Sequence, residues 1–125
     1  MITSLLQVAA GGALGAGARY LVNVAAMRAF GPGFPWATIV VNVAGSFLMG
    51  VLVVWLAKRG GMGWAPFLMT GVLGGFTTFS AFSLDVATLW ERGEAGLAAA
   101  YALGSVVLSV GALFAAMWLM RGWAA

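Results

Sequence analysis

Four long apolar stretches, separated by short polar turns, occupy almost all of this 125-residue chain. They cover residues 2–20 with an apolar extension to Phe30, then 36–57, 64–90 and 95–120. Crossing a hydrocarbon core about 30 Å thick takes roughly 20 apolar residues in a helix, so each stretch can span a bilayer once. The sequence therefore predicts an all-α membrane protein with four transmembrane helices, built as a single domain over residues 1–125.

The composition fits a bilayer better than it fits water. Hydrophobic residues make up 63% of the chain and charged residues only 7%, which is too little charge to solvate the surface of a compact domain of this size. The first apolar stretch has no basic segment before it and no small-residue cleavage site. We therefore expect it to be retained as a span rather than removed as a signal peptide.

Several classes of function are excluded by residues that the chain lacks. There is no cysteine and no histidine, which removes thiolate metal sites, disulfides, Cys or His nucleophiles and an imidazole base; we expect no enzymatic activity. The net charge of +3 results from six basic and three acidic residues. The basic residues are scattered along the sequence and do not form the cluster that binds nucleic acid or acidic lipid. We expect no nucleic-acid partner.

The basic residues give little indication of orientation. One side of the membrane would carry Lys58, Arg59 and Arg121, and the other Arg28 and Arg92, which is hardly a bias under the positive-inside rule. Two interpretations stay open: a single weak orientation, or insertion in both orientations followed by antiparallel pairing. Four helices leave no obvious room for an aqueous pathway, so transport would need at least a second copy.

Two stripes of hydrogen-bonding side chains run inside the predicted spans. Each recurs at i, i+4 and i+8, which places its members on one helical face. The stripes are Thr38, Asn42 and Ser46 in the second span, and Tyr101, Ser105 and Ser109 in the fourth. Hydroxyls can bond back to their own helix and an asparagine can join neighbouring helices, but two aligned stripes favour a lined pathway.

The chemistry of these stripes favours an anion or a neutral solute. Hydroxyls and a carboxamide supply donors, and spans one, two and four contain no carboxylate for the acidic ring of a cation pore. Asp85 is the one acidic residue within a span. It falls in the last turns of the third span, where we expect it to be solvated or paired with a basic neighbour rather than to relay protons.

Small residues recur in the first two spans and permit close approach between helix backbones. Packing alone is the simplest explanation for most of them. These glycines are Gly11, Gly12, Gly15, Gly17, Gly45 and Gly50.

The third span is interrupted by Gly74-Gly75-Phe76-Thr77-Thr78, because paired glycines followed by β-branched threonines propagate a helix poorly. A break frees carbonyls before it and N–H groups after it, and hydrocarbon satisfies neither. A bound cation can take the carbonyls, while the start of the second half-helix favours negative charge. The alternative is a glycine hinge whose backbone groups are satisfied by neighbouring helices and threonine hydroxyls.

Two phenylalanines follow the break directly, at Phe79 and Phe82, with Ser80 and Ser83 beside them. The edge of a phenyl ring carries partial positive charge and can point at an anion. Helical spacing alone would make these rings ordinary lipid-facing or core aromatics. Their position after the break makes an anion contact worth testing.

Three segments resemble a known family, the small bacterial fluoride channels called CrcB or Fluc. They are GALGAGARY at 12–20, VNVAGSFLMG at 41–50 and GVLGGFTTFSAFS at 71–83. The similarity covers essentially the whole chain, and the third segment is highly specific. One position departs from the pattern, since Ala81 stands where the family more often has a hydroxyl.

The resemblance implies a dual-topology antiparallel homodimer of four-helix subunits in the bacterial inner membrane. It implies a structural Na⁺ at the dimer centre, bound by backbone carbonyls that match Gly74 and Thr77 here. It also implies passive fluoride export along two narrow pathways, with Arg19 in a vestibule near the mouth. The residues that match the fluoride pathway are Asn42, Phe79, Phe82, Tyr101, Ser105, Ser109, Thr38 and Ser80.

Two other functions stay open at the level of sequence. A small multidrug antiporter has the same four-helix size, but exchanging protons for cations needs an ionisable carboxylate in the membrane, and the first span has none. A non-transporting assembly subunit built on glycine packing predicts no ion flux, and it leaves the donor stripes unexplained.

Overall fold

A computed structural model describes residues 1–124, and these residues form helices and short connections without a strand. The elements are α1 (Ile2–Phe30), α2 (Trp36–Arg59), η1 (Met62–Trp64), η2 (Pro66–Leu73), α3 (Gly74–Phe76), α4 (Phe79–Glu91) and α5 (Ala95–Ala124). Grouped by continuity, four helical segments are long and apolar enough to cross a membrane: Ile2–Phe30, Trp36–Arg59, Met62–Glu91 and Ala95–Trp123. The predicted four spans are confirmed, and the extension to Phe30 belongs to the first helix.

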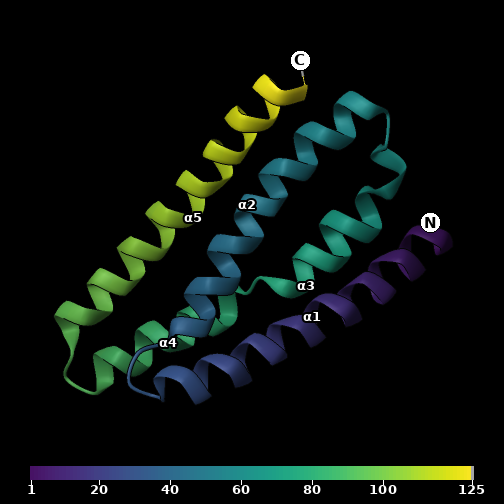
Figure 1. Cartoon of the computed structure of the whole chain (residues 1–125). Coiled ribbons are helices and arrows are strands. Elements are labelled where there is room, and N and C mark those ends of the chain that lie inside the picture. Colours follow the sequence, from purple (N-terminus) through teal and green to yellow (C-terminus); the bar gives the residue numbers. More distant parts are fainter. Residues whose placement is uncertain (125) are drawn as a thin grey trace.

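The helices associate as two pairs. α2 packs along α5, and α1 packs along η2 and α3. Figure 1 shows the two pairs diverging from the side of the molecule where α4 and two of the turns lie, with α1 and α5 on opposite outer sides. Few residues of the spans are buried within the chain. In each candidate span, only 11–28% of an apolar stretch of 18 residues is buried. Most of the apolar surface of a single chain is therefore left for lipid or for another protein to cover.

Glycines set the distance between α1 and the third span. A Cβ on Gly15 would overlap the Val72 carbonyl, and a Cβ on Gly75 would approach the Gly12 carbonyl at 2.7 Å. Gly11, Gly45 and Gly50 are equally crowded by backbone or side chains of neighbouring helices, so close packing explains most of the glycines singled out from the sequence. Gly12 and Gly17 differ, because a Cβ at either position would meet nothing within 4 Å in this chain.

The third span is irregular along its length. It begins with a single 3₁₀ turn at η1 and continues as π-helical turns through η2, a geometry that is rare in helices and is often associated with functional sites. After the short α3, Thr77 (φ −86°, ψ 163°) and Thr78 (φ −154°, ψ 125°) have extended backbones. The chain returns to α-helix at Phe79, where α4 begins.

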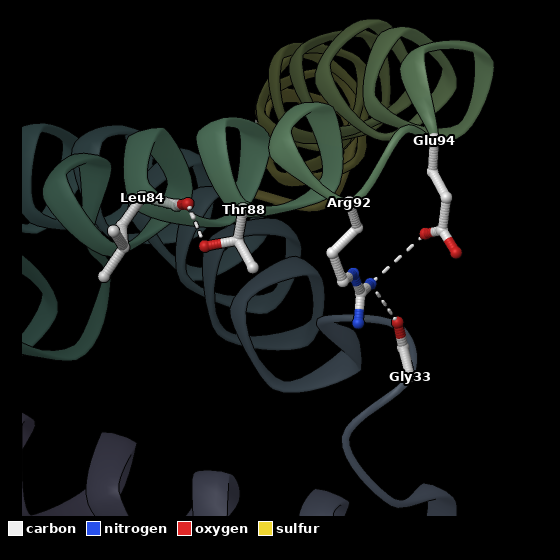
Figure 2. Close-up of polar contacts among 5 residues, drawn as sticks. All are labelled: Gly33, Leu84, Thr88, Arg92 and Glu94. Atoms are coloured by element: carbon white, nitrogen blue, oxygen red, sulfur yellow. Dashed lines mark hydrogen bonds and ion pairs between the residues drawn. The ribbon is translucent and has the colours of Figure 1, made fainter.

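Two turns on the same side of the molecule are tied together by Arg92. Its guanidinium donates to the Gly33 carbonyl of the α1–α2 turn at 2.7 Å and pairs with the Glu94 carboxylate at 3.3 Å (Figure 2). A small core forms where α4 packs on α5. It consists of Phe82, Leu89, Ala98 and Tyr101. Arg92 and this core fix the position of α4, which carries both phenylalanines of interest.

Gly15→Ala should destabilise the fold, because the added methyl would overlap backbone that cannot move as a flexible side chain can. We expect a loss of roughly 1–3 kcal/mol, the usual cost of overpacking, seen as a lower midpoint in thermal unfolding followed by size-exclusion chromatography in detergent. Gly17→Ala, two residues along the same helix and facing open space, is the matched control. Equal midpoints for the two variants would contradict this account of the glycines.

Candidate functional site

An open groove of about 330 Å³ lies where α2, α5 and the start of α4 meet. Both donor stripes contribute two members to it, Asn42 and Ser46 from α2 and Ser105 and Ser109 from α5. Thr77, Thr78, Phe79 and Phe82 line it from the third span. The remaining lining residues are Gly45, Met49, Val106, Val110 and Leu113. No acidic side chain is among the lining residues that the structure describes.

Asn42 holds the backbone between α3 and α4. Its Nδ2 donates to the Thr78 carbonyl at 3.0 Å, and its Oδ1 accepts from the Thr78 N–H at 2.8 Å. The backbone N–H and carbonyl of Thr78 are thereby both hydrogen-bonded, although Thr78 lies outside any helix. The Nδ2 group carries a second hydrogen on a side chain that faces the groove. The side chain therefore combines a structural contact with a donor that can serve a ligand.

The Thr78 side chain starts α4. Its Oγ1 accepts from the Ala81 N–H at 3.1 Å, which is the capping interaction that threonine makes at a helix N-terminus. Ser80 is exposed, and its hydroxyl lies 3.3 Å from the Thr78 Oγ1. The sequence carries the signal for this cap, a threonine directly before the first residue of a helix.

The carbonyls of Gly74 and Thr77 are left without their usual helical donors. The Thr77 and Thr78 amides, which would ordinarily reach the Gly74 carbonyl, donate instead to the Leu73 carbonyl and to Asn42. The Ala81 amide, which would ordinarily reach the Thr77 carbonyl, donates to the Thr78 hydroxyl. Gly74 is also exposed in a single chain, so its carbonyl belongs to a region open to a further group.

Arg19 also contacts the backbone just before Thr77 and Thr78. Its Nε donates to the Gly75 carbonyl at 3.1 Å, across the contact between α1 and the third span. An arginine within a span needs such a partner, because an unpaired charge in hydrocarbon is costly. The Gly75 carbonyl is thus satisfied from α1, in contrast to the carbonyl of its neighbour Gly74.

An aromatic series runs from the groove toward the α1–α2 turn. Phe79 lies 76% exposed, and its ring centroid is 5.5 Å from that of the buried Phe82. Phe82 in turn lies 5.3 Å from Tyr101, and Tyr101 meets Phe34 edge-on at 5.4 Å. Phe79 and Phe82 therefore line the groove, while Tyr101 and Phe34 continue the series away from it.

Tyr101 and Thr38 do not line this groove. The Tyr101 hydroxyl donates to the Asp85 carboxylate at 2.9 Å, and Thr38 is buried beside a second, smaller pocket of about 180 Å³ that also contains Asp85 and Arg92. Asp85 was expected to be solvated or paired with a basic neighbour; the structure shows it half-buried and bonded to the tyrosine hydroxyl, and no ion pair of Asp85 is present in the described residues. Each stripe therefore divides: Thr38 lines the small pocket and Tyr101 bonds Asp85, while the other members of both stripes line the groove.

Ser105 has a donor with no protein partner. The residue is only 3% exposed, and its Oγ makes no hydrogen bond within the described part of the chain. Buried hydroxyls are nearly always paired, so an unpaired one that lines a groove marks a place where a ligand or water completes the bonding.

Comparison with known proteins identifies the family of this chain. Residues 6–117 match the family model described as CrcB-like protein, Camphor Resistance (CrcB). A protein of Cereibacter sphaeroides named "Fluoride-specific ion channel FluC" is 70% identical over 125 residues, which is the full length of both chains. The protein of that name from Paracoccus denitrificans is 60% identical over 119 residues, covering 95% of each chain. The chain belongs to the CrcB family.

Proposed function

We propose that this protein is a fluoride channel that exports fluoride from the bacterial cytoplasm by passive conduction. The observation that carries the proposal is the groove, which brings the Asn42 amide, the unpaired Ser105 hydroxyl and two phenyl rings together without a carboxylate. The relatives of 60–70% identity that carry the name of a fluoride-specific channel support it independently.

Fluoride is small and strongly hydrated, so it can leave water only where donors replace its hydration shell. Hydroxyl and amide donors do so directly, and ring edges add partial positive charge. A series of weak sites lets an anion enter and also leave. The membrane potential, worth about 2.3 kcal/mol per charge per 100 mV, then drives an anion out of a negative interior.

The groove of one chain is open along its side, and a second copy would close it. The second copy in our proposal is inverted, giving an antiparallel homodimer. Support comes from the small difference in basic residues between the two ends, three against two, and from exposed surface at Gly74 and Phe79 beside the groove. A two-fold axis makes such an interface self-complementary, so one contact would create two equivalent pathways.

A structural Na⁺ fits the backbone at Gly74 and Thr77. Hard cations take oxygen ligands such as backbone carbonyls, and these two carbonyls have lost their usual amide donors to Asn42 and Thr78. Two carbonyls from each of two copies would hold the ion, which would neutralise their negative ends and join the subunits at the axis.

The two other functions considered from the sequence have no support here. The groove lacks the carboxylate that proton exchange requires, since Asp85 lies at the smaller pocket and bonds Tyr101. An assembly subunit would have no use for an unpaired buried hydroxyl.

Purified protein in liposomes should release fluoride rapidly and chloride negligibly, as recorded by ion-selective electrodes. Ser105→Ala should fold normally, because its hydroxyl has no protein partner to lose, but it should slow fluoride release by roughly 10–100-fold, the worth of one hydrogen bond to a charged group. Ser4→Ala, in α1 and away from both pockets, is the matched control. If the wild type releases neither anion, the channel proposal is wrong. If Ser105→Ala releases fluoride as fast as the wild type, Ser105 does not contact the conducted ion.

Replacing Na⁺ by N-methylglucamine during purification should weaken the dimer, because four carbonyl dipoles would then face one another unscreened. The measurement is the dimer fraction by cross-linking in detergent, with and without Na⁺. Restoring Na⁺ should restore the dimer, whereas restoring the same ionic strength with N-methylglucamine chloride should not. A dimer fraction that is the same in both salts would contradict the proposed Na⁺ site.

A further inference from the structure

A basic cluster forms where α2 and α5 end. Lys58 and Arg59 occupy the last turn of α2, and Arg121 lies in the last turn of α5, which packs along α2. The Lys58 Nζ donates to the Arg121 carbonyl at 3.4 Å, joining residues 63 positions apart in sequence. All three side chains are exposed. The basic residues look scattered along the chain, but folding brings these three together.

The acidic residues lie at the other end of the molecule. The three are Asp85, Glu91 and Glu94, all in α4 or the turn after it. Figure 1 places that turn on the side opposite the end of α2, and the 24 residues of α2 separate the two ends by about 36 Å. At the far end Arg92 is paired with Glu94 (Figure 2). No carboxylate in the described residues neutralises Lys58, Arg59 and Arg121.

The surroundings of the cluster place it at the level of lipid headgroups. Trp55, Trp118 and Trp123 lie in the last turns of α2 and α5 and are exposed, and tryptophans at helix ends sit at the membrane–water boundary. A guanidinium presents a fork of donors that matches phosphate geometry. The Lys58 ammonium has three donors, of which the Arg121 carbonyl takes one.

We propose that the Lys58–Arg59–Arg121 cluster binds the headgroup of an anionic phospholipid. The phosphate would accept from the guanidinium and ammonium donors, and the acyl chains would lie along exposed apolar side chains of α5 such as Leu119. A lipid fits better than free phosphate because the cluster sits beside an apolar surface and a tryptophan belt. The inference does not depend on what the groove conducts.

The test is native mass spectrometry of the full-length protein released from vesicles of equal phosphatidylcholine and phosphatidylglycerol. The wild type should retain phosphatidylglycerol in preference to phosphatidylcholine. Each charge removed should weaken retention by about fivefold, so Arg59→Gln should lose about fivefold and the Lys58→Gln, Arg59→Gln, Arg121→Gln combination far more. Arg28→Gln, an exposed arginine in the last turn of α1 at the acidic end, should leave retention unchanged.

The single variants keep the test decisive if the triple variant does not fold. Equal retention by Arg59→Gln and Arg28→Gln would overturn the proposal. Binding of inorganic phosphate by the wild type, with no preference for phosphatidylglycerol over phosphatidylcholine, would show that the cluster binds free phosphate and would overturn the assignment to lipid. Fluoride release in pure phosphatidylcholine vesicles is a separate measurement, so failure here leaves the channel proposal intact.

Discussion

The satisfaction of backbone groups at Thr77 and Thr78 is the constraint on which the rest of the site depends. Hydrocarbon offers no partner for a free N–H or carbonyl, and the extended backbone at these two residues would otherwise be costly in a membrane. Asn42 from α2 bonds both polar groups of Thr78, and the Thr78 hydroxyl caps α4. These contacts fix where α4 starts, and hence where Phe79 and Phe82 stand relative to Ser105.

The number of spans could be predicted from the sequence because bilayer thickness alone requires long apolar stretches. That Asn42 lies on one face with Ser46, and Ser105 with Ser109, also followed from helical spacing, whereas the packing of α2 along α5 brings the two faces to one groove. The partners of individual groups could not be predicted. Nothing local indicates that Asn42 bonds Thr78, or that Tyr101 bonds Asp85, because these contacts depend on how separate helices are placed against one another.

The same limit applies to the charged residues and the glycines. Arg19 reaches the Gly75 carbonyl only because Gly11, Gly15 and Gly75 let α1 approach the third span closely. Lys58 and Arg121 become neighbours only when α2 and α5 pair. Gly17 is as prominent in the sequence as Gly15, yet it faces open space within the subunit. A residue type indicates what a group can do, and the packing decides which group it meets.

The central claim is that one chain forms half of a fluoride pathway, which an inverted copy completes. The chain has no cysteine, so Trp123→Cys at the end of α5 supplies a single label for a membrane-impermeant maleimide applied to intact cells. Dual insertion predicts that about half of the protein is labelled from outside and the remainder only after the cells are opened. Labelling of all or of none of the protein from outside would show one orientation and contradict the account.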